Sequence, residues 1–155
     1  MRKDVTSDPV VVAEVLHSAK YASLALADAQ GPYCVPVNFA FKDGLLYLHS
    51  AKKGRKIEAL RRAEQSGAAV AFCAATDLAP KTGEKACQWG YTFRSVLGAG
   101  RVRILNDPAQ ALAGLGVIMH KYAGSDDFPY DDNILAATLV VVIELDWATA
   151  RLKLE

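Results

Sequence analysis

Large apolar residues recur at every second position along parts of this chain and at helical spacing along others. In the run YCVPVNFAF, residues 33–41, large apolar residues alternate with smaller or polar ones, which predicts a β-strand. Strand-like runs flank it on both sides, and the turn residues of AQGP and KDG separate the three runs. We therefore expect two successive hairpins, which together form an antiparallel meander within residues 21–51.

Three segments show helical periodicity with start and stop signals. Residues 7–20 contain Asp8, a predicted N-cap, followed by proline at the first helical position. A second helix is expected to begin at the KKGRK turn, residues 52–56, and to end near the glycine of QSG. The strongest pattern is NDPAQALAGLGVIMHKYAG, residues 106–124, with Asp107 as the N-cap and a terminal glycine as the stop signal.

The remaining apolar runs predict further strands. They are AAVAFCAA, WGYTFRSVLGAGRVRIL and TLVVVIELDWATARLKL, at residues 68–75, 89–105 and 138–154. Two glycines in the second run mark a bulge or a bend. The segment TDLAPKTGEKACQ, residues 76–88, is expected to form a long exposed loop, and SDDFPYDDN a polar one. About six strands, with helices early, in the middle and late, indicate an α+β fold around an antiparallel sheet or barrel.

Composition and charge exclude several functional classes. The chain has 155 residues, 52% hydrophobic and 23% charged, which fits one globular domain with a sizeable core. Its 18 Lys and Arg residues against 17 Asp and Glu residues give a net charge of +1, so no basic field exists to bind nucleic acid or an anionic membrane. The longest apolar run, residues 134–145, is too short to span a bilayer and contains Glu144. Because the start of the chain shows no signal-peptide pattern, we expect a cytoplasmic protein.

Cysteine and histidine spacings do not indicate a metal or disulfide site. Cys34, Cys73 and Cys87 are odd in number and widely spaced, which fits neither a disulfide framework nor a CxxC motif. We expect them to be buried, inert thiols. The three histidines are isolated and lack HExxH or paired spacing, so no protein-held metal is expected.

Four cations crowd the short turn before the second helix. In SAKKGRK, Lys52, Lys53, Arg55 and Lys56 lie where the partial positive charge of a helix N-terminus makes cations unfavourable. A bound anion would reverse this, because the free N–H groups, the helix dipole and the cations would all attract it, and Ser50 would add a hydroxyl. A solvated basic turn that binds nothing is the alternative interpretation. The turn also lacks the GxxxxGK[ST] pattern of a nucleotide phosphate loop.

Pro36 interrupts the neighbouring strand pattern. Proline cannot donate to a strand ladder, so this strand is expected at a sheet edge or beside something other than a strand, for which a flat ligand is one candidate. In the next run, His49 shares a face with Leu45 and Tyr47. A lone histidine on an apolar face is usually a hydrogen-bonded packing residue, and spacing alone assigns it no function.

The order of these motifs resembles that of one known family. VPVNFAF, the segment from GLLYLHSA to GRKIEAL, YTFRSVLGAGRVRIL, and a helix that begins with Asp-Pro and ends in MHKYAG follow one another within residues 21–124. This order and spacing resemble the pyridoxamine 5'-phosphate oxidase-like flavoproteins, and most closely their nitroimidazole-reductase-like branch. The resemblance implies a single FMN-binding split-barrel domain over residues 1–155, with an α+β fold, an antiparallel split β-barrel and flanking helices. It also implies a homodimer with FMN in the cleft between the two subunits.

The resemblance assigns candidate site residues. It implies that the FMN phosphate is surrounded by His49, Ser50, Arg55 and Lys56. It implies that the isoalloxazine ring lies along Val35, Pro36, Val37 and Asn38. It places Tyr91, Thr92 and Ser95 on a strand that lines the same cleft. The alternative is that these three residues have structural roles only. A histidine at the position of His49 lies near the flavin in this branch, which implies a catalytic or substrate-facing role.

The function implied by the resemblance is an FMN-binding oxidoreductase that reduces a small aromatic or nitro compound with electrons from NAD(P)H. A non-catalytic flavin or haem carrier, or a redox sensor, is the alternative, because no acid and base pair is evident. Related branches bind haem or a deazaflavin in place of FMN. A third hypothesis is a protein whose basic turn binds a partner without any cofactor. The C-terminal ELDWATARLKLE matches true pyridoxamine 5'-phosphate oxidases only loosely, so vitamin B6 oxidation is not expected.

Overall fold

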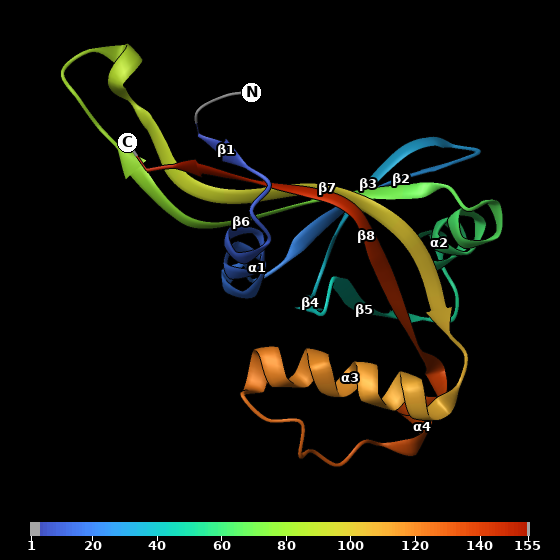
Figure 1. The fold of residues 1–155 in the computed structure, drawn as a ribbon. Helices are drawn as coiled ribbons and strands as arrows, with labels where there is room; N and C mark the ends of the chain where they lie inside the picture. The colour runs from blue at the N-terminus through green and yellow to red at the C-terminus, as the bar shows by residue number, and fades with distance from the viewer. Residues whose placement is uncertain (1–3, 155) are drawn as a thin grey trace.

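Eight strands and four α-helices make up residues 4–154, the part of the chain described by the structure, which is a computed structural model (Figure 1). In chain order the elements are β1 (Val5–Thr6), α1 (Pro9–Ser18), β2 (Ala22–Asp28), β3 (Gly31–Val37), β4 (Phe39–Lys42), β5 (Leu45–Ala51), α2 (Arg55–Ser66), β6 (Ala69–Lys81), a 3-10 turn η1 (Ala86–Gln88), β7 (Gly90–Leu105), α3 (Pro108–Ala123), α4 (Asp132–Ala137) and β8 (Thr138–Lys153). All strand pairs are antiparallel and belong to one sheet, which confirms the predicted α+β class. The three predicted helices are all present.

The sheet is almost closed on itself. Its strand order is β3-β2-β6-β7-β8-β5-β4, with β1 paired to β8. The two edge strands, β3 and β4, are joined by Asn38 alone, so the sheet has to curl until its edges nearly meet. No ladder joins these edges within the described residues, and the result is the split barrel that the sequence predicts. We call the point where the chain passes between the edges, Val37 to Phe39, the seam.

The predicted meander of residues 21–51 is wrong in one respect. Both hairpins form, since β2 pairs with β3 and β4 pairs with β5. The run of residues 33–41, however, is two strands at opposite edges of the sheet and not one strand. Its alternation ends at the seam, because Phe39 and Ala40 are consecutive and both buried. Pro36, which has no N–H to donate, lies in edge strand β3, as its chemistry requires.

Strands β6 and β7 continue as a long paired arm where the sequence predicts an exposed loop. The arm consists of residues 75–81 of β6 and residues 90–95 of β7. β6 runs through Lys81, and its pairing with β7 continues to that residue. A register shift between Thr76 and Ala79 interrupts the ladder without ending it. The arm projects from the sheet at the end opposite α2 (Figure 1). The prediction of a loop is therefore wrong for the first half of residues 76–88, because cross-strand pairing extends the strand beyond its apolar run.

Both faces of the central strands are covered. The main core joins α1 and α2 to one face of the sheet, with Leu16 and Leu60 fully buried. A second, smaller cluster of Leu105, Val140 and Val142 lies on the opposite face under α3. Because both sides of β8 are buried at this point, its sequence is a continuous apolar run and does not alternate.

The three cysteines are exposed, contrary to the prediction of buried thiols. Cys73 alternates with the buried Phe72 and Ala74 along β6, so its side chain faces away from the core. Cys34 lies on the outward side of edge strand β3 in the same way. The register of the sheet, and not the small size of the side chain, determines which face of a strand each cysteine occupies.

Helix α3 packs closely on the second cluster at Gly114. A Cβ atom at this position would lie 2.8 Å from Cγ1 of Val140, so only glycine allows this approach. From the predicted apolar stripe of α3, Ile118 is buried, whereas Tyr122 is 42% exposed. The polar loop that follows ends in a short helix, α4, which no sequence pattern predicted and which Asp131 caps. Among residues 4–154, no helix has the length and apolar character needed to cross a membrane.

The C-terminal end of α3 holds the seam. The Tyr122 hydroxyl accepts a hydrogen bond from the Phe39 backbone N–H at 3.0 Å and donates one to the Lys20 carbonyl at 2.7 Å. The Lys121 ammonium donates to the Leu16 carbonyl at 3.0 Å and lies 3.5 Å from the centroid of the Phe39 ring. Burial, followed by the charge of Lys20, lowers the pKa of Lys121 to about 8. Two adjacent side chains of α3 therefore tie the seam to α1 and to the start of β2.

We predict that Lys121→Met changes how stability depends on pH. The folded state holds the pKa of Lys121 at about 8, whereas the unfolded chain has it at about 10.4, so the unfolded state binds more protons between these values. The Lys121 contribution to the free energy of unfolding therefore rises with pH in this window, by about 1–2 kcal/mol for a half-buried amine. Urea titrations at pH 7 and pH 10 should show the rise in the wild type and not in the variant. An equal change with pH in both proteins would contradict this assignment.

Candidate functional site

The cationic turn lies between β5 and α2, and this helix start differs from the others. Helices α1, α3 and α4 each begin with an Asp side chain that accepts backbone N–H bonds. Helix α2 begins at Gly54, which has a φ of 116° and no side chain to cap the helix. The N–H groups of its first turn therefore have no capping side chain as acceptor, and they carry the positive end of the helix dipole. A phosphate group fits this position.

The structure places His49 and Ser50 near the end of β5 and Arg55 and Lys56 at the start of α2, on the two sides of this turn. Nζ of Lys56 donates to the His49 carbonyl at 3.4 Å. Ser50 is 6% exposed and faces the core side of β5, whereas His49 faces the other side. Burial lowers the pKa of Lys56, and partial burial followed by the Lys56 charge lowers the pKa of His49. An anion bound here would give the poorly solvated Lys56 ammonium a counter-charge.

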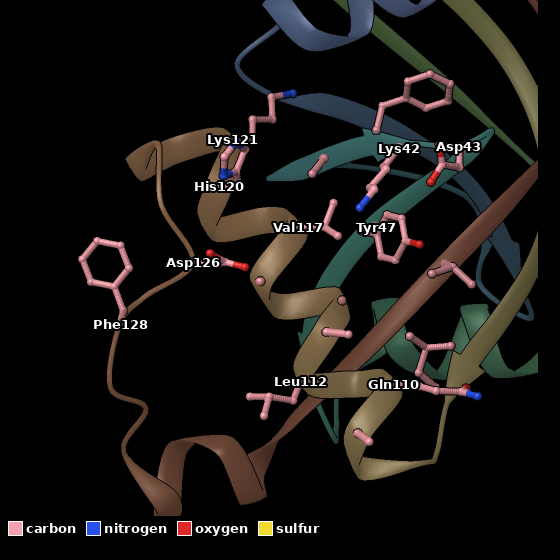
Figure 2. Close-up of a pocket in the computed structure, with 18 of the residues that line it drawn as sticks. Lys42, Asp43, Tyr47, Gln110, Leu112, Val117, His120, Lys121, Asp126 and Phe128 are labelled. Carbon is pink, nitrogen blue, oxygen red and sulfur yellow. The ribbon is translucent and has the colours of Figure 1, made fainter.

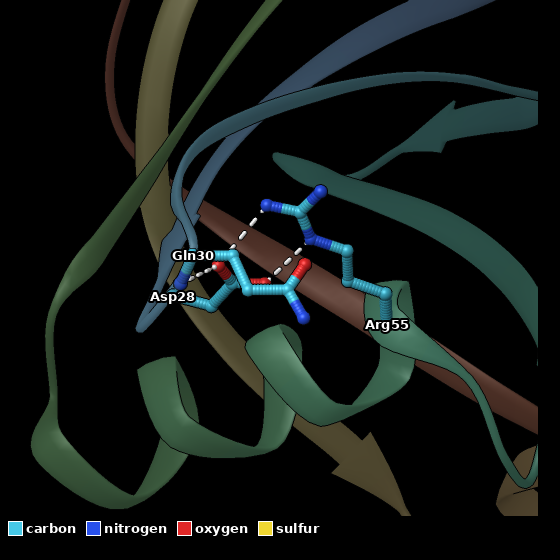
Figure 3. A network of polar contacts seen from close by, with 3 residues as sticks. All are labelled: Asp28, Gln30 and Arg55. Atoms are coloured by element: carbon cyan, nitrogen blue, oxygen red, sulfur yellow. Dashed lines mark hydrogen bonds and ion pairs between the residues drawn. The ribbon is translucent and has the colours of Figure 1, made fainter.

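Arg55 already has a carboxylate partner (Figure 3). Its Nε and Nη2 atoms donate to the two oxygens of Asp28 at 2.6 and 3.0 Å, and the Gln30 backbone N–H donates to the same carboxylate at 2.8 Å. The guanidinium carbon lies 4.3 Å from the centroid of the Tyr33 ring. The hydrogen bonds between them lower the pKa of Asp28 and raise that of Arg55. An anion at α2 would therefore accept hydrogen bonds from the Arg55 N–H groups that do not already donate to Asp28.

The residues expected along a flavin ring gather at the seam. Val35, Pro36, Val37 and Asn38 span the end of β3 and the crossing residue. The last three, with Tyr21, line a hollow of about 510 Å³. The β4-β5 register pairs Phe39 with Leu48. One step further along, Asn38 and His49 therefore lie at the same end of this strand pair, which brings the seam and the cationic turn to one region.

Tyr91, Thr92 and Ser95 lie elsewhere, on the outer part of β7. Oγ1 of Thr92 donates to the Ala79 carbonyl at 3.4 Å, and Ser95 pairs with Ala75 in the β6-β7 ladder. The Tyr91 side chain is 55% exposed. This part of β7 belongs to the arm, at the end of the molecule opposite α2 (Figure 1). Within one chain, the three residues are not brought to the cationic turn.

Sequence reasoning did not identify Asp28 and Tyr33 as neighbours of Arg55. Asp28 ends an apolar strand beside a turn, a place where aspartate is ordinary turn chemistry. It lies 27 residues before Arg55, and no local pattern connects the two positions. The one signal in the sequence was a lone carboxylate in a stretch that otherwise lacks charge.

Comparisons with known proteins bear on the family and on the fold. A family model described as pyridoxamine 5'-phosphate oxidase matches residues 10–152. No curated protein matches the sequence. Among solved structures, a candidate 5-nitroimidazole antibiotic resistance protein from Bacteroides thetaiotaomicron is 26% identical, and the match covers 94% of this chain and 84% of that one with a TM-score of 0.79.

Two further solved structures share the fold. A flavocytochrome from Azotobacter vinelandii is 18% identical, with a TM-score of 0.84, and the match covers 100% of this chain and 73% of that one. A protein from Mycobacterium smegmatis that binds FAD and haem is 16% identical, with a TM-score of 0.83, and the match covers 99% of this chain and 75% of that one. At these identities the likeness shows the fold alone.

We predict that Asp28→Asn destabilises the protein at neutral pH and much less in acid. The folded-state pKa of Asp28 lies below its ordinary value, so its carboxylate stabilises the fold above about pH 4, and this contribution is lost as the pH falls through the folded-state pKa. The urea midpoint of the variant should be lower than that of the wild type at pH 7, and the gap should narrow towards about pH 2. Asp127→Asn, an exposed control, should leave the midpoint unchanged. A gap of constant size would show that pairing with Arg55 is not the cause.

Proposed function

Because the chain belongs to the pyridoxamine 5'-phosphate oxidase family, we propose that it is a cytoplasmic FMN-binding oxidoreductase with one split-barrel domain over residues 1–155. In this proposal it reduces a small aromatic or nitro compound with electrons from NAD(P)H. The observation that carries the proposal is the start of α2, where a helix N-terminus without a side-chain cap is followed directly by Arg55 and the partly buried Lys56. The 26% identity to the candidate nitroimidazole resistance protein supports the class of substrate.

Lys56 is the main phosphate contact in this proposal. Its ammonium is partly buried, and its one hydrogen bond in the described part of the chain goes to the His49 carbonyl at 3.4 Å. A phosphate dianion would supply the counter-charge that Lys56 lacks. Arg55, by contrast, is already partly neutralised by Asp28. Lys56 therefore contributes more than Arg55 to the affinity for the FMN phosphate. Ser50 and the α2 N–H groups add neutral hydrogen bonds.

His49 is the proposed catalytic residue. When bound, the flavin supplies the redox chemistry, and the protein positions it and controls access to it. The backbone of residues 35–38 would run along the ring, with His49 at the same end of the β4-β5 pair as Asn38. Because its pKa is lowered, the His49 imidazole is neutral at pH 7, and it can donate a hydrogen bond to a substrate or accept a proton from it.

A non-catalytic flavin or haem protein, either a carrier or a redox sensor, is the second candidate function. The fold likeness to a flavocytochrome and to a protein that binds FAD and haem is the observation that favours it. A neutral imidazole, as at His49, is also the form that ligates haem iron, and a deazaflavin is a third cofactor for the same cleft. Steady turnover of a nitroaromatic compound with NAD(P)H would exclude a carrier. Tight cofactor binding without turnover would exclude the oxidoreductase.

We infer a homodimer from the outward face of the sheet and from the arm. Leu97 and Trp147 share this face in the β7-β8 ladder and are 51% and 49% exposed. Large apolar side chains grouped on a surface are typical of protein interfaces. The arm, which carries Tyr91, Thr92 and Ser95, projects from the sheet at the end opposite α2 (Figure 1). In this proposal, a second copy packed on this face supplies these three residues to the cationic turn of the first.

We predict that Lys56→Gln raises the Kd for FMN by about tenfold or more, because the variant removes a cation that has no other counter-charge. Arg55→Gln should raise it by only about two- to fivefold, because Asp28 already neutralises much of the Arg55 charge. Lys53→Gln, exposed on the same turn, is the matched control and should have almost no effect. Quenching of FMN fluorescence measures all three values. Equal losses in the three variants would show that diffuse charge, and not a built phosphate site, binds the cofactor.

We predict that Leu97→Glu separates the dimer and removes FMN binding with it, because a charge would be desolvated in the interface. Sedimentation velocity should show a dimer for the wild type and a monomer for the variant. Val10→Glu introduces the same charge at a position on α1 that is 64% exposed, and it should leave both dimer and FMN affinity intact. A monomeric Leu97→Glu variant that binds FMN at full strength would contradict a cleft shared by two chains.

A further inference from the structure

A groove outside the proposed flavin site runs between α3 and the β4-β5 hairpin (Figure 2). Its whole volume, which includes space beside Asp126 and Phe128 on the other side of α3, is about 1360 Å³. Pockets that take small organic molecules have volumes of about 300–1000 Å³, so this groove is large enough for one. Of the described residues that line it, none is among those assigned above to FMN.

Four strands form the floor of this groove. The register aligns Ala40 with Tyr47, Tyr47 with Val142, and Val142 with Arg103, on β4, β5, β8 and β7. All four residues line the groove. Lys42, two residues after Ala40, lies on the same face of β4. The middle of the floor is therefore apolar and contains the Tyr47 ring, with a cation on either side.

The two cations that border the floor form no ion pair within residues 4–154. Lys42 and Arg103 make no ion pair or hydrogen bond through their side chains with any residue in 4–154. Figure 2 shows the Lys42 side chain extending from β4 into the space beside Tyr47 and facing α3. Two carboxylates also line the groove: Asp43 lies next to Lys42 at the hairpin turn, and Asp126 lies across α3 from it. The sheet side of the groove therefore carries an excess of positive charge.

Two other basic side chains in the wall, those of His17 and Lys121, are already engaged, whereas His120 has no side-chain partner among the described residues. Nε2 of His17 lies 3.0 Å from the Phe41 carbonyl, and the Lys121 ammonium donates to the Leu16 carbonyl at 3.0 Å. These contacts fix the walls of the groove at its α1 end. The charge that remains available to a bound molecule is that of Lys42 and Arg103.

An unpaired hydroxyl provides an independent observation. The oxygen of Tyr130 is buried and has no hydrogen-bond partner among the described residues, and Tyr130 lines the same groove. A buried hydroxyl without a partner is unfavourable, and such groups are rare in folded proteins. Because this hydroxyl lies across α3 from the sheet-side floor, it marks a second polar point of the groove and is not a contact of a molecule lying on the Tyr47 ring.

We propose that this groove binds an organic anion with a flat apolar body. The body lies on the Tyr47 ring, and a carboxylate or sulfonate group is met by Lys42 or, at the other end of the floor, by Arg103. Tyr47 and Arg103 are two strands apart, which is about 10 Å, the length of a two-ring aromatic acid. The site is separate from the FMN site and does not depend on it.

Titration of the full-length protein with 8-anilinonaphthalene-1-sulfonate, followed by fluorescence, tests this proposal. The double variant Lys42→Gln, Arg103→Gln should raise the Kd of this anion about tenfold or more. N-phenyl-1-naphthylamine, which has the same rings and no sulfonate, should bind the variant and the wild type within about twofold of each other. The control variant Lys52→Gln, Lys81→Gln removes the same charge from exposed positions outside the groove and should not change the Kd of the sulfonate. Circular dichroism spectra and urea midpoints would check that each variant is folded.

Competition with FMN separates this inference from the proposed function. Saturating FMN should leave the Kd of the sulfonate unchanged. If the wild-type protein takes up no FMN, it should still bind the sulfonate with the same Kd. Displacement of the sulfonate by FMN would assign the groove to the flavin site and overturn the proposal. Failure of the sulfonate to bind, or equal affinity for the groove and control variants, would overturn it as well.

Discussion

The passage of the chain between two sheet edges through a single residue, Asn38, is the constraint on which the rest of the structure depends. β3 and β4 stand at opposite ends of the strand order, so they can be joined by one residue only if the sheet curls on itself. Tyr122 and Lys121 then hold this seam from the end of α3, which in turn covers the second hydrophobic cluster. The same closure places Asn38 near His49, in the last part of β5 before the cationic turn.

The positive charge at the start of α2 comes from backbone N–H groups without a capping side chain and from a lysine without a carboxylate partner among residues 4–154. The other three α-helices of residues 4–154 are capped by their own Asp side chains, and this one begins at a glycine. A helix start that served stability alone would carry a similar cap, because a capping side chain contributes about 1 kcal/mol. The chain instead places Arg55 and Lys56 there, and only Arg55 has a carboxylate partner. This asymmetry is the physical basis for proposing a phosphate contact at Lys56.

Local signals were sufficient to predict the three longer helices and the two hairpins. Asp8 and Asp107 cap as expected, because N-caps depend on neighbouring residues alone. Long-range pairing decided the features that were missed: whether residues 33–41 form one strand or two, how far β6 extends, and which carboxylate Arg55 meets. The turn and seam residues of the candidate site are brought to one region. The β7 residues lie apart from it in a single chain, and no pattern within one sequence indicates how two copies pack.

The affinity of the protein for FMN relative to riboflavin, measured by calorimetry, tests the central claim most directly. The two molecules share the ring and differ in the phosphate, so their comparison isolates the contribution of the α2 N-terminus and Lys56. If that phosphate site exists, FMN should bind at least about 100-fold more tightly than riboflavin. Equal affinities, or no binding of either molecule, would contradict the account.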